Sequence, residues 1–261
     1  MTSALEVNRR ENLGGGFYHT RPAAGGAVIV SGALANIGMQ ALMSPAPLNA
    51  RDREAFHDWV SAACPNAASR LRGVDQVHSA SVVAAASLRD GRRVDADGVI
   101  AADAHDAPVV MAADCAPVWL FDPAKQVVGL LHAGWRGVAA GIIEAGVRAA
   151  EDTGAAALRL VAAIGPHLQA CCFEVGPDVA SQFPGHTRPA ATLVIERHRN
   201  DGVALDLSSA IEARLRAVHV PTIHTALACT RCRADILHSY RRNGKGGPLM
   251  AAIGFAGSGL A

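Results

Sequence analysis

The stretch PVVMAADCAPVWLFDPAKQVVGLLHAGWRG, residues 108–137, decides the fold. It contains three short apolar runs, Pro108 to Ala113, Val118 to Phe121 and Val127 to His132, which are separated by residues that favour turns. Apolar runs of this length, bounded by turn residues, are typical of buried strands. We therefore expect three consecutive strands in the middle of the chain.

Helical and strand patterns alternate on the C-terminal side of this stretch. The spacing of apolar residues predicts a helix over Val138 to Thr153 that stops at Gly154, and a strand over Leu158 to Ile164. Two further strands are expected at Thr222 to Leu227 and at Leu249 to Phe255. Between them, four apolar residues share one helical face, with a serine and a glutamate at the spacing of a capping box (Leu207, Ile211, Leu215 and Val218; Ser209 and Glu212).

The N-terminal side is less regular. Gly26 to Ser31 is a possible strand, Arg51 to Ala63 has helical spacing and is ended by Pro65, and Asp75 to Ala86 reads as a strand. Strands mixed with helices along the whole chain, without an internal repeat or a linker, indicate an α/β (α+β) fold. We expect one domain over residues 1–261.

Composition excludes several classes of protein. The chain has 261 residues, half of them hydrophobic, and a net charge of +1 with its basic residues scattered, which argues against a nucleic-acid partner. No apolar run has the length of a membrane span, and the first residues lack a secretory signal. Six cysteines without such a signal favour thiols or metal ligands over disulfides. We expect a cytoplasmic protein.

Three good metal ligands stand at predicted strand ends: His78, Cys115 and His132. Strand ends on one side of a sheet converge, so residues distant in sequence can share a site. Two imidazoles and one thiolate suit Zn²⁺, and three protein ligands leave a fourth position open, as in catalytic zinc sites. Spacing alone keeps the alternative open that Cys115 is a small core residue and that each histidine is structural.

Longer motifs resemble those of the YfiH family, also called the DUF152 or laccase-domain (polyphenol oxidase) family. They follow the family's order over about residues 70 to 255: QVHS (76–79), DADGVIA (95–101), ADCAPVWLFDP (113–123), VVGLLHAGWRGVAAGII (127–143), AIGPHLQACCFEVGPDV (163–179) and CTRC…SYRRNG (229–244). HAGWRG after an ADC-P segment is the most specific of them.

The resemblance implies a single-domain, mixed-sheet sandwich, related to bacterial deamidating toxins that use a Cys–His pair. The family's metal ligands match His78, Cys115 and His132 one for one. The resemblance also implies a zinc-dependent enzyme that cleaves adenosine, inosine and S-methyl-5′-thioadenosine with phosphate and deaminates adenosine as a side activity. Copper is the alternative metal, because the family's older label is copper polyphenol oxidase.

The sequence departs from the family pattern in two places. The family's N-terminal S-x-R-x-G-G-x-S segment has no counterpart in HTRPAAGGAVIVS (19–31), so residues 1–50 match poorly. Asn243 stands where the family has Asp after SYRR, and the arginine expected a few residues later is missing from GKGGP (244–248). We expect these departures to affect substrate preference.

Phosphorolysis needs an anion site, for which Arg136 and Arg241 are the candidates, because guanidinium groups offer paired donors to phosphate. Backbone N–H groups at Gly134 and Gly137 are possible additional donors. The alternative is that Arg136 forms a structural ion pair and the glycines make a turn. Asp114 is a weaker candidate for proton transfer, because neighbouring strand residues point to opposite faces.

The remaining candidates are open to a functional or a structural reading. Cys229-x-x-Cys232 and the adjacent Cys171-Cys172 suggest a second, structural zinc, although neighbouring cysteines are an awkward ligand set. Three residues are possible pocket-lining groups or ordinary surface or core (His167, His238 and Tyr240), and two tryptophans are expected to be packing anchors (Trp119 and Trp135).

Three other functions compete with a nucleoside enzyme. A multicopper oxidase needs paired HxH motifs, and the sequence has none. A metal-free hydrolase would use Cys115 as nucleophile and His132 as base. A binding protein with a vestigial site is the third alternative. The substrate preference and the oligomeric state stay open.

Overall fold

The computed structural model of the protein describes residues 11–20, 28–35, 39–44, 58, 70–91, 94–189, 202–244 and 249–255. Apart from Asp58, the helix expected at Arg51 to Ala63 lies outside these residues.

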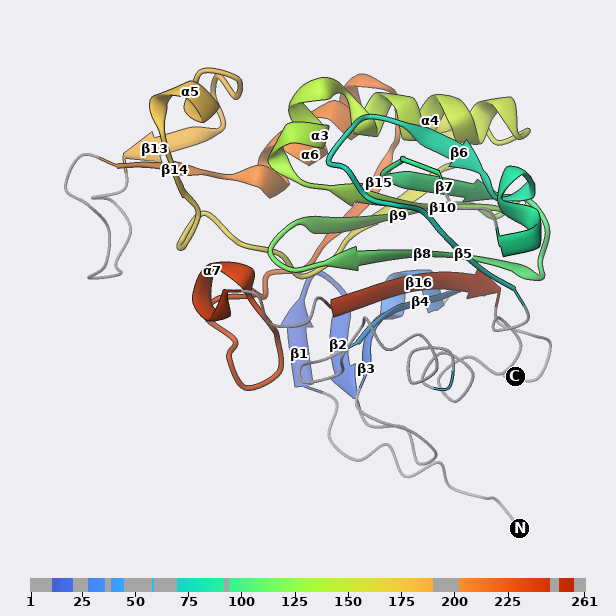
Figure 1. Ribbon diagram of the computed structural model, residues 1–261, viewed down its shortest axis with the longest axis horizontal. Coiled ribbons are helices and arrows are strands. Elements are labelled where there is room, and N and C mark those ends of the chain that lie inside the picture. Colours follow the sequence, from blue (N-terminus) through green and yellow to red (C-terminus); the bar gives the residue numbers. More distant parts are fainter. Residues whose placement is uncertain are drawn as a thin grey trace, which may run out of the picture.

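Two large sheets form the framework of the described chain (Figure 1). The first has seven strands, in the spatial order β1 (Glu11–Gly14), β2 (Phe17–Thr20), β3 (Val28–Ser31), β4 (Met39–Met43), β16 (Leu249–Phe255), β8 (Asp106–Ala112) and β5 (Arg70–Gly73). The second has six, in the order β15 (Thr222–Thr225), β11 (Val161–Ile164), β9 (Ala116–Asp122), β10 (Val127–Ala133), β7 (Gly98–Ala101) and β6 (Val82–Ala84). Both sheets are mixed, since parallel pairs β5–β8, β6–β7 and β11–β15 accompany antiparallel ones.

Shorter elements complete the fold. A small sheet has the order β12 (Glu174–Val175), β14 (Val203–Leu205) and β13 (Thr187–Pro189). The helices are α1 (Gly32–Ala35), α3 (Trp135–Ala140), α4 (Ile142–Asp152), α5 (Pro177–Ala180), α6 (Leu207–Ala217) and α7 (Tyr240–Asn243), with 3₁₀ turns at Ala85–Gly91 and Ala157–Arg159. No helix among the described residues is long and apolar enough to cross a membrane.

The six-stranded sheet lies between helices and the other sheet, which gives three layers (Figure 1). The side chains of β9 show why the sheet has a layer on each side. Successive residues of a strand point to opposite faces of the sheet. Val118 and Leu120 pack with residues of α4 and α6, whereas Trp119 and Phe121 pack against the seven-stranded sheet. A strand buried on both faces reads as a continuous apolar run, which is the pattern that the sequence shows here.

The mixed α/β fold and the three central strands are confirmed, as β8, β9 and β10, and the predicted strands near residues 222 and 249 correspond to β15 and β16. Gly26 to Ser31 contains β3, and Leu158 to Ile164 contains a 3₁₀ turn followed by β11. The first central strand, however, belongs to the seven-stranded sheet, while the other two pair in the six-stranded one.

The helical character expected over Val138 to Thr153 is confirmed, although the chain turns through Gly141 at φ 97° and so divides the segment between α3 and α4. Two local predictions were wrong. Asp75 to Ala86 is mostly a loop, with only Val82–Ala84 in a strand. Ser209 does not cap α6: Asp206 is the N-cap, and its carboxylate accepts the backbone N–H of Ser209.

Candidate active site and metal centre

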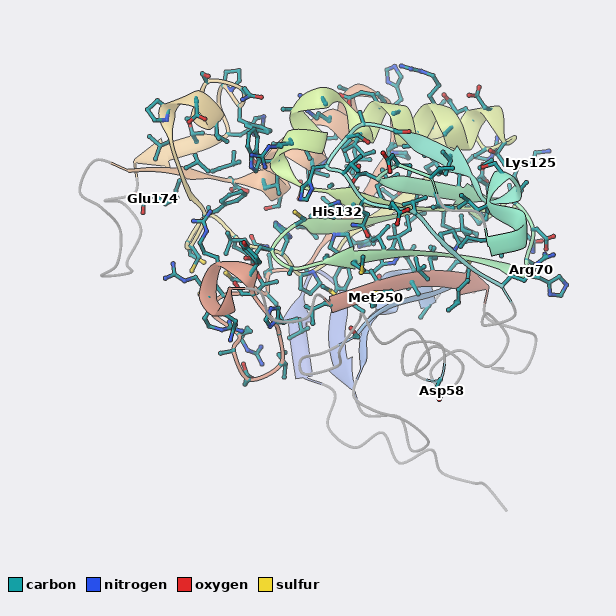
Figure 2. All side chains as sticks on the ribbon, in the orientation of Figure 1. Asp58, Arg70, Lys125, His132, Glu174 and Met250 are labelled. Atoms are coloured by element: carbon teal, nitrogen blue, oxygen red, sulfur yellow. The ribbon has the colours of Figure 1, made fainter. Side chains whose placement is uncertain are left out.

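Two loops that cross between the large sheets meet the end of β10. One connects β5 to β6 and carries His78; the other connects β8 to β9 and carries Cys115. His132 is the second-last residue of β10 and is 4% exposed. Figure 2 shows His132 near one end of the central sheet, with Lys125 and Arg70 toward the opposite end. The three candidate ligands therefore converge, although His78 lies in a loop and not at a strand start.

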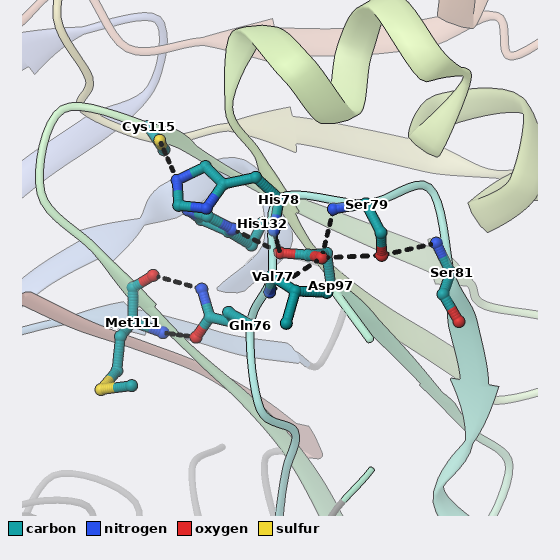
Figure 3. A network of polar contacts seen from close by, with 9 residues as sticks. All are labelled: Gln76, Val77, His78, Ser79, Ser81, Asp97, Met111, Cys115 and His132. Atoms are coloured by element: carbon teal, nitrogen blue, oxygen red, sulfur yellow. Dashed lines mark hydrogen bonds and ion pairs between the residues drawn. The ribbon is translucent and has the colours of Figure 1, made fainter. Parts of the chain in front are cut away.

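The three side chains lie close enough to share an ion (Figure 3). Each offers one ligand atom, and these atoms lie within 4.8 Å of one another. The Sγ of Cys115 is 3.9 Å from Nε2 of His78. The imidazole rings of His78 and His132 meet edge to face, with their centroids 4.8 Å apart. This is a His/Cys group able to hold a metal ion.

A buried carboxylate, Asp97, organises two of the three candidates (Figure 3). Its Oδ1 lies 2.8 Å from Nδ1 of His132 and accepts the backbone N–H of His78 at 3.0 Å. Its Oδ2 accepts the backbone N–H and the hydroxyl of Ser79, at 2.6 and 2.8 Å. Because Nδ1 of His132 is held by Asp97, its Nε2 is the atom left for a metal or for Cys115.

The same contacts set the protonation of the site. Although burial opposes it, hydrogen bonding from His132 and Ser79 lowers the pKa of Asp97 far below its usual range. Burial likewise opposes ionisation of Cys115, but His132 and His78 lower its pKa to about 7. Against burial, Asp97 and then Cys115 raise the pKa of His132 to about 9. The thiolate and the imidazolium thus stabilise each other.

Backbone geometry lets the loops close around the site. A Cβ on Gly134 would stand 2.8 Å from Sγ of Cys115 and 3.2 Å from Cδ2 of His78, so any larger residue there would displace these candidate ligands. His78 itself has φ 61° and Asp114 has φ 84°, both in the left-handed region that few non-glycine residues adopt. The His78 N–H donates to Asp97 and the Thr230 hydroxyl donates to Asp114, and these bonds help to hold both residues in these conformations.

Gln76 fixes the His78 loop to β8. Its side-chain amide donates to the carbonyl of Met111 at 2.7 Å and accepts the Met111 N–H at 2.7 Å (Figure 3). Beyond the end of β5, these two side-chain hydrogen bonds to β8 take the place of the backbone hydrogen bonds between the strands. The loop carrying His78 and the strand leading to Cys115 are therefore joined directly.

Each of the two candidate phosphate ligands is held by contacts of its own. Arg136 follows Gly134 by two residues and stacks its guanidinium over the ring of Trp135, 4.4 Å from the centroid. Arg241 donates its backbone N–H to Asp114 at 2.6 Å, and its guanidinium donates to the carbonyl of Glu174 at 3.2 Å. Asp114 also accepts the Thr230 hydroxyl at 2.6 Å, so it serves as an anchor between loops.

The possible pocket residues differ in surroundings. His167 is fully buried and hydrogen-bonded to the carbonyl of Gly165, which is a structural role. Tyr240 is 58% exposed on α7. His238 buries its Nε2 without a hydrogen-bond partner among the described residues, and burial and then Arg242 lower its pKa. Trp119 is a buried packing residue, as expected.

Sequence reasoning missed Asp97, Gln76 and Thr230 as site residues. The available signal for Asp97 was an acidic residue directly before a short buried strand, in DADGVIA, since a buried acid needs partners. No sequence pattern marked Gln76 or Thr230, because each acts through a contact with a segment that is distant in the sequence.

Comparison with known proteins identifies the family and supports the fold. The family described as multi-copper polyphenol oxidoreductase laccase matches residues 49–256. The crystal structure of YlmD from Geobacillus stearothermophilus superimposes with a TM-score of 0.77 at 25% identity, covering 91% of this chain and 98% of that one. The chain belongs to the YfiH family. Its family match begins at residue 49, beyond the poorly matched N-terminal segment.

Curated relatives of this YfiH-family chain carry enzyme names. A purine nucleoside phosphorylase of Streptomyces coelicolor is 34% identical over 189 residues, which are 71% of this chain and 75% of that protein. An adenosine deaminase, RL5, of an unknown prokaryotic organism is 34% identical over 137 residues, 52% of each chain.

Proposed function

We propose that the protein is a zinc-dependent purine nucleoside phosphorylase that acts on adenosine, inosine and S-methyl-5′-thioadenosine and deaminates adenosine as a side activity. The observation that carries the proposal is the convergence of His78, Cys115 and His132 around one point, with His132 oriented by Asp97. The names of relatives about one-third identical to this chain support the substrate class.

The donor set fits zinc. Two imidazoles and a thiolate are the borderline-soft ligands that zinc prefers, and three ligands leave room for substrate. The Asp97–His132 contact is the support that histidine ligands of zinc usually have. When bound, the ion would supply a Lewis acid beside the reacting atoms.

The chain's own residues would provide the rest of the chemistry. Phosphorolysis requires a phosphate oxygen aimed at C1′ of the ribose while the base leaves. The guanidinium groups of Arg136, two residues after Gly134, and of Arg241, whose backbone N–H donates to Asp114, would bind and orient the phosphate. The group that protonates the departing base is open, and His238 is a candidate because its buried Nε2 has no partner among the described residues.

A metal-free cysteine hydrolase is the second candidate. The lowered pKa of Cys115 and its pairing with His132, which Asp97 supports, have the arrangement of a nucleophile, a base and an orienting acid. Such a dyad has no need of His78, whose Nε2 lies 3.9 Å from the same sulfur. We favour the metal site for that reason. Copper oxidase chemistry is disfavoured by the lack of HxH motifs in the sequence.

The test is chromatography of adenosine incubated with the purified, zinc-loaded protein, with and without phosphate. Phosphate-dependent adenine, or phosphate-independent inosine, is expected from the wild type and not from Cys115→Ala. Arg241→Ala should raise the KM for phosphate, whereas Arg148→Ala, on the exposed side of α4, should not. No turnover by a protein that holds stoichiometric zinc would reject the proposal. Turnover of an amide substrate by metal-free protein would favour the hydrolase.

A further inference from the structure

Four cysteines lie together outside the site described above. Cys171 and Cys172 belong to the loop after β11, and Cys229 and Cys232 to the loop after β15. These two strands are parallel neighbours, so both loops leave the same edge of the sheet. The loops are joined by an isolated β-bridge between the backbones of His167 and Cys229. The Thr230 N–H also donates to the His167 carbonyl at 3.0 Å. The fold therefore brings the four thiols together.

The distances suit a tetrahedral ion. All four sulfurs lie within 4.8 Å of one another. The Sγ of Cys232 is 3.8 Å from that of Cys171 and 3.5 Å from that of Cys172. Zinc–thiolate bonds of about 2.3 Å in a tetrahedron place the sulfurs about 3.8 Å apart, whereas a disulfide needs about 2.05 Å. The adjacent pair Cys171-Cys172 thus presents both sulfurs to one point, which the sequence alone made improbable.

Backbone amides support a thiolate at this position. The N–H groups of Gln169, Cys232 and Arg231 donate to the sulfur of Cys229. Two of these donors come from the turn of the Cys-x-x-Cys segment itself, so the segment is wrapped around its first sulfur. An anionic sulfur ligand is stabilised by such donors.

We propose that Cys171, Cys172, Cys229 and Cys232 bind a structural zinc ion, separate from the candidate site at His78, Cys115 and His132. Four thiolates fill a tetrahedral ion and leave no open position, so this ion would have no catalytic role. The proposal does not depend on the proposed nucleoside chemistry.

The ion would fix a loop that reaches the candidate active site. Thr230, between the two loop cysteines, donates its hydroxyl to Asp114, which precedes Cys115. Arg242 donates to the carbonyls of Thr230 and Arg231, both at 2.7 Å, and so ties α7 to the same loop. Zinc at the four cysteines would therefore hold α7, with Arg241, beside the first site.

The test is the zinc content of purified protein, measured by mass spectrometry of the elements on the wild type and on three variants. We expect about two zinc ions in the wild type and about one in each of Cys232→Ser and Cys115→Ala, since each variant lacks one complete ligand set. Ser181→Ala, at an exposed residue of the described chain that belongs to neither ligand group, is the control and should keep both ions.

X-ray absorption at the zinc edge of Cys115→Ala gives a second, independent measurement. The remaining ion should show four sulfur ligands at about 2.3 Å, and this result stands even if Cys232→Ser does not fold. A single zinc in the wild type that Cys232→Ser leaves in place would overturn the proposal. So would a zinc in Cys115→Ala with nitrogen ligands, or a non-reduced protein whose mass shows the two hydrogens of a disulfide missing at these cysteines.

Discussion

Asp97 connects two of the three candidate ligands, His78 and His132, at the scale of single residues. Its two oxygens take hydrogen bonds from the backbone of His78 and Ser79 and from the imidazole of His132, while the side chain is fully buried. A buried carboxylate is stable only with such partners. One acid therefore sets both the path of the His78 loop and the tautomer of His132.

Asp97→Asn should weaken metal binding at the first site 10- to 100-fold, because an amide is a poorer partner for a metal-bound imidazole. The change is measured by competition with a chromophoric zinc chelator. Asp95→Asn, an exposed acid two residues away, is the control and should bind as the wild type does. Equal affinity of Asp97→Asn and wild type would mean that Asp97 serves only the fold.

Gly134→Ala should reduce metal occupancy of the first site without unfolding the protein. The added methyl would contact Sγ of Cys115 at 2.8 Å, while the φ of −75° at this position suits alanine. Gly154→Ala provides the contrast: it meets no atom within 4 Å but has φ 105°, so it should lower stability by about 1–2 kcal/mol and leave the metal in place. Metal content and urea unfolding of both variants check this.

The donors of the candidate site could be selected from the sequence because their chemical types are rare and they stand beside apolar runs. His78, Cys115 and His132 met both conditions, and the structure brings them together. Asp97 had a weaker signal, since its value comes from backbone amides that fold over it from a segment about 20 residues earlier. Roles that depend on the meeting of loops are not encoded in local spacing.

At the scale of elements, the buried central strands were the clearest prediction. Apolar runs buried on both faces, such as Val127 to His132, have few other interpretations. The helical character predicted from Val138 to Thr153 is confirmed, but the break was not foreseen because the apolar period continues through Gly141, whose positive φ turns the chain. Capping of α6 was assigned to Ser209 although Asp206 starts the helix, because both residues are good caps by type.

Asp122, at the end of β9, should stabilise the β9–β10 hairpin in a pH-dependent way. Its buried carboxylate accepts the N–H groups of Ala124, Lys125 and Ala156 and pairs with Arg159 at 2.7 Å. Burial opposes ionisation, but Arg159 and then these amides lower the pKa below the usual 3.8. The stabilisation is therefore present above about pH 4 and is lost as the pH falls through the lowered pKa.

Asp122→Asn should therefore lower the free energy of unfolding at pH 7, and the difference from wild type should shrink below about pH 4. Urea unfolding at a series of pH values measures it, with Asp152→Asn on the exposed part of α4 as control. A difference that stays constant down to low pH would show that hydrogen-bond geometry, and not the charge, is responsible.

At the scale of the whole molecule, the sequence did not predict which strands belong to which of the two large sheets. β8 and β9 are separated by only three residues, yet they lie in different sheets, and Cys115 occupies the crossing. Nothing in the spacing of the two apolar runs distinguishes such a crossing from a hairpin. The site depends on this crossing, since it carries Cys115 toward the His78 loop. A single domain over residues 1–261 stays a prediction, favoured by two hydrophobic clusters that share the central sheet.

Substitution of Trp119 tests whether the packing between the two large sheets can be weakened without loss of metal from the candidate site. Its indole N–H donates to the carbonyl of Ala252 on β16 at 3.0 Å, and its ring lies 6.0 Å from that of Phe17. Trp119→Phe should remove this bond between the sheets, leave a small cavity and lower stability by about 1–3 kcal/mol. The Gln76–Met111 and Asp97 contacts hold the ligand loops locally, so zinc content and turnover at 25 °C should stay at the wild-type level. Thermal unfolding and zinc analysis on the same sample show whether stability falls while the zinc content stays the same. Zinc loss in a variant that is still folded would mean that the spacing of the sheets, rather than the local contacts, sets the distance between His78 and Cys115.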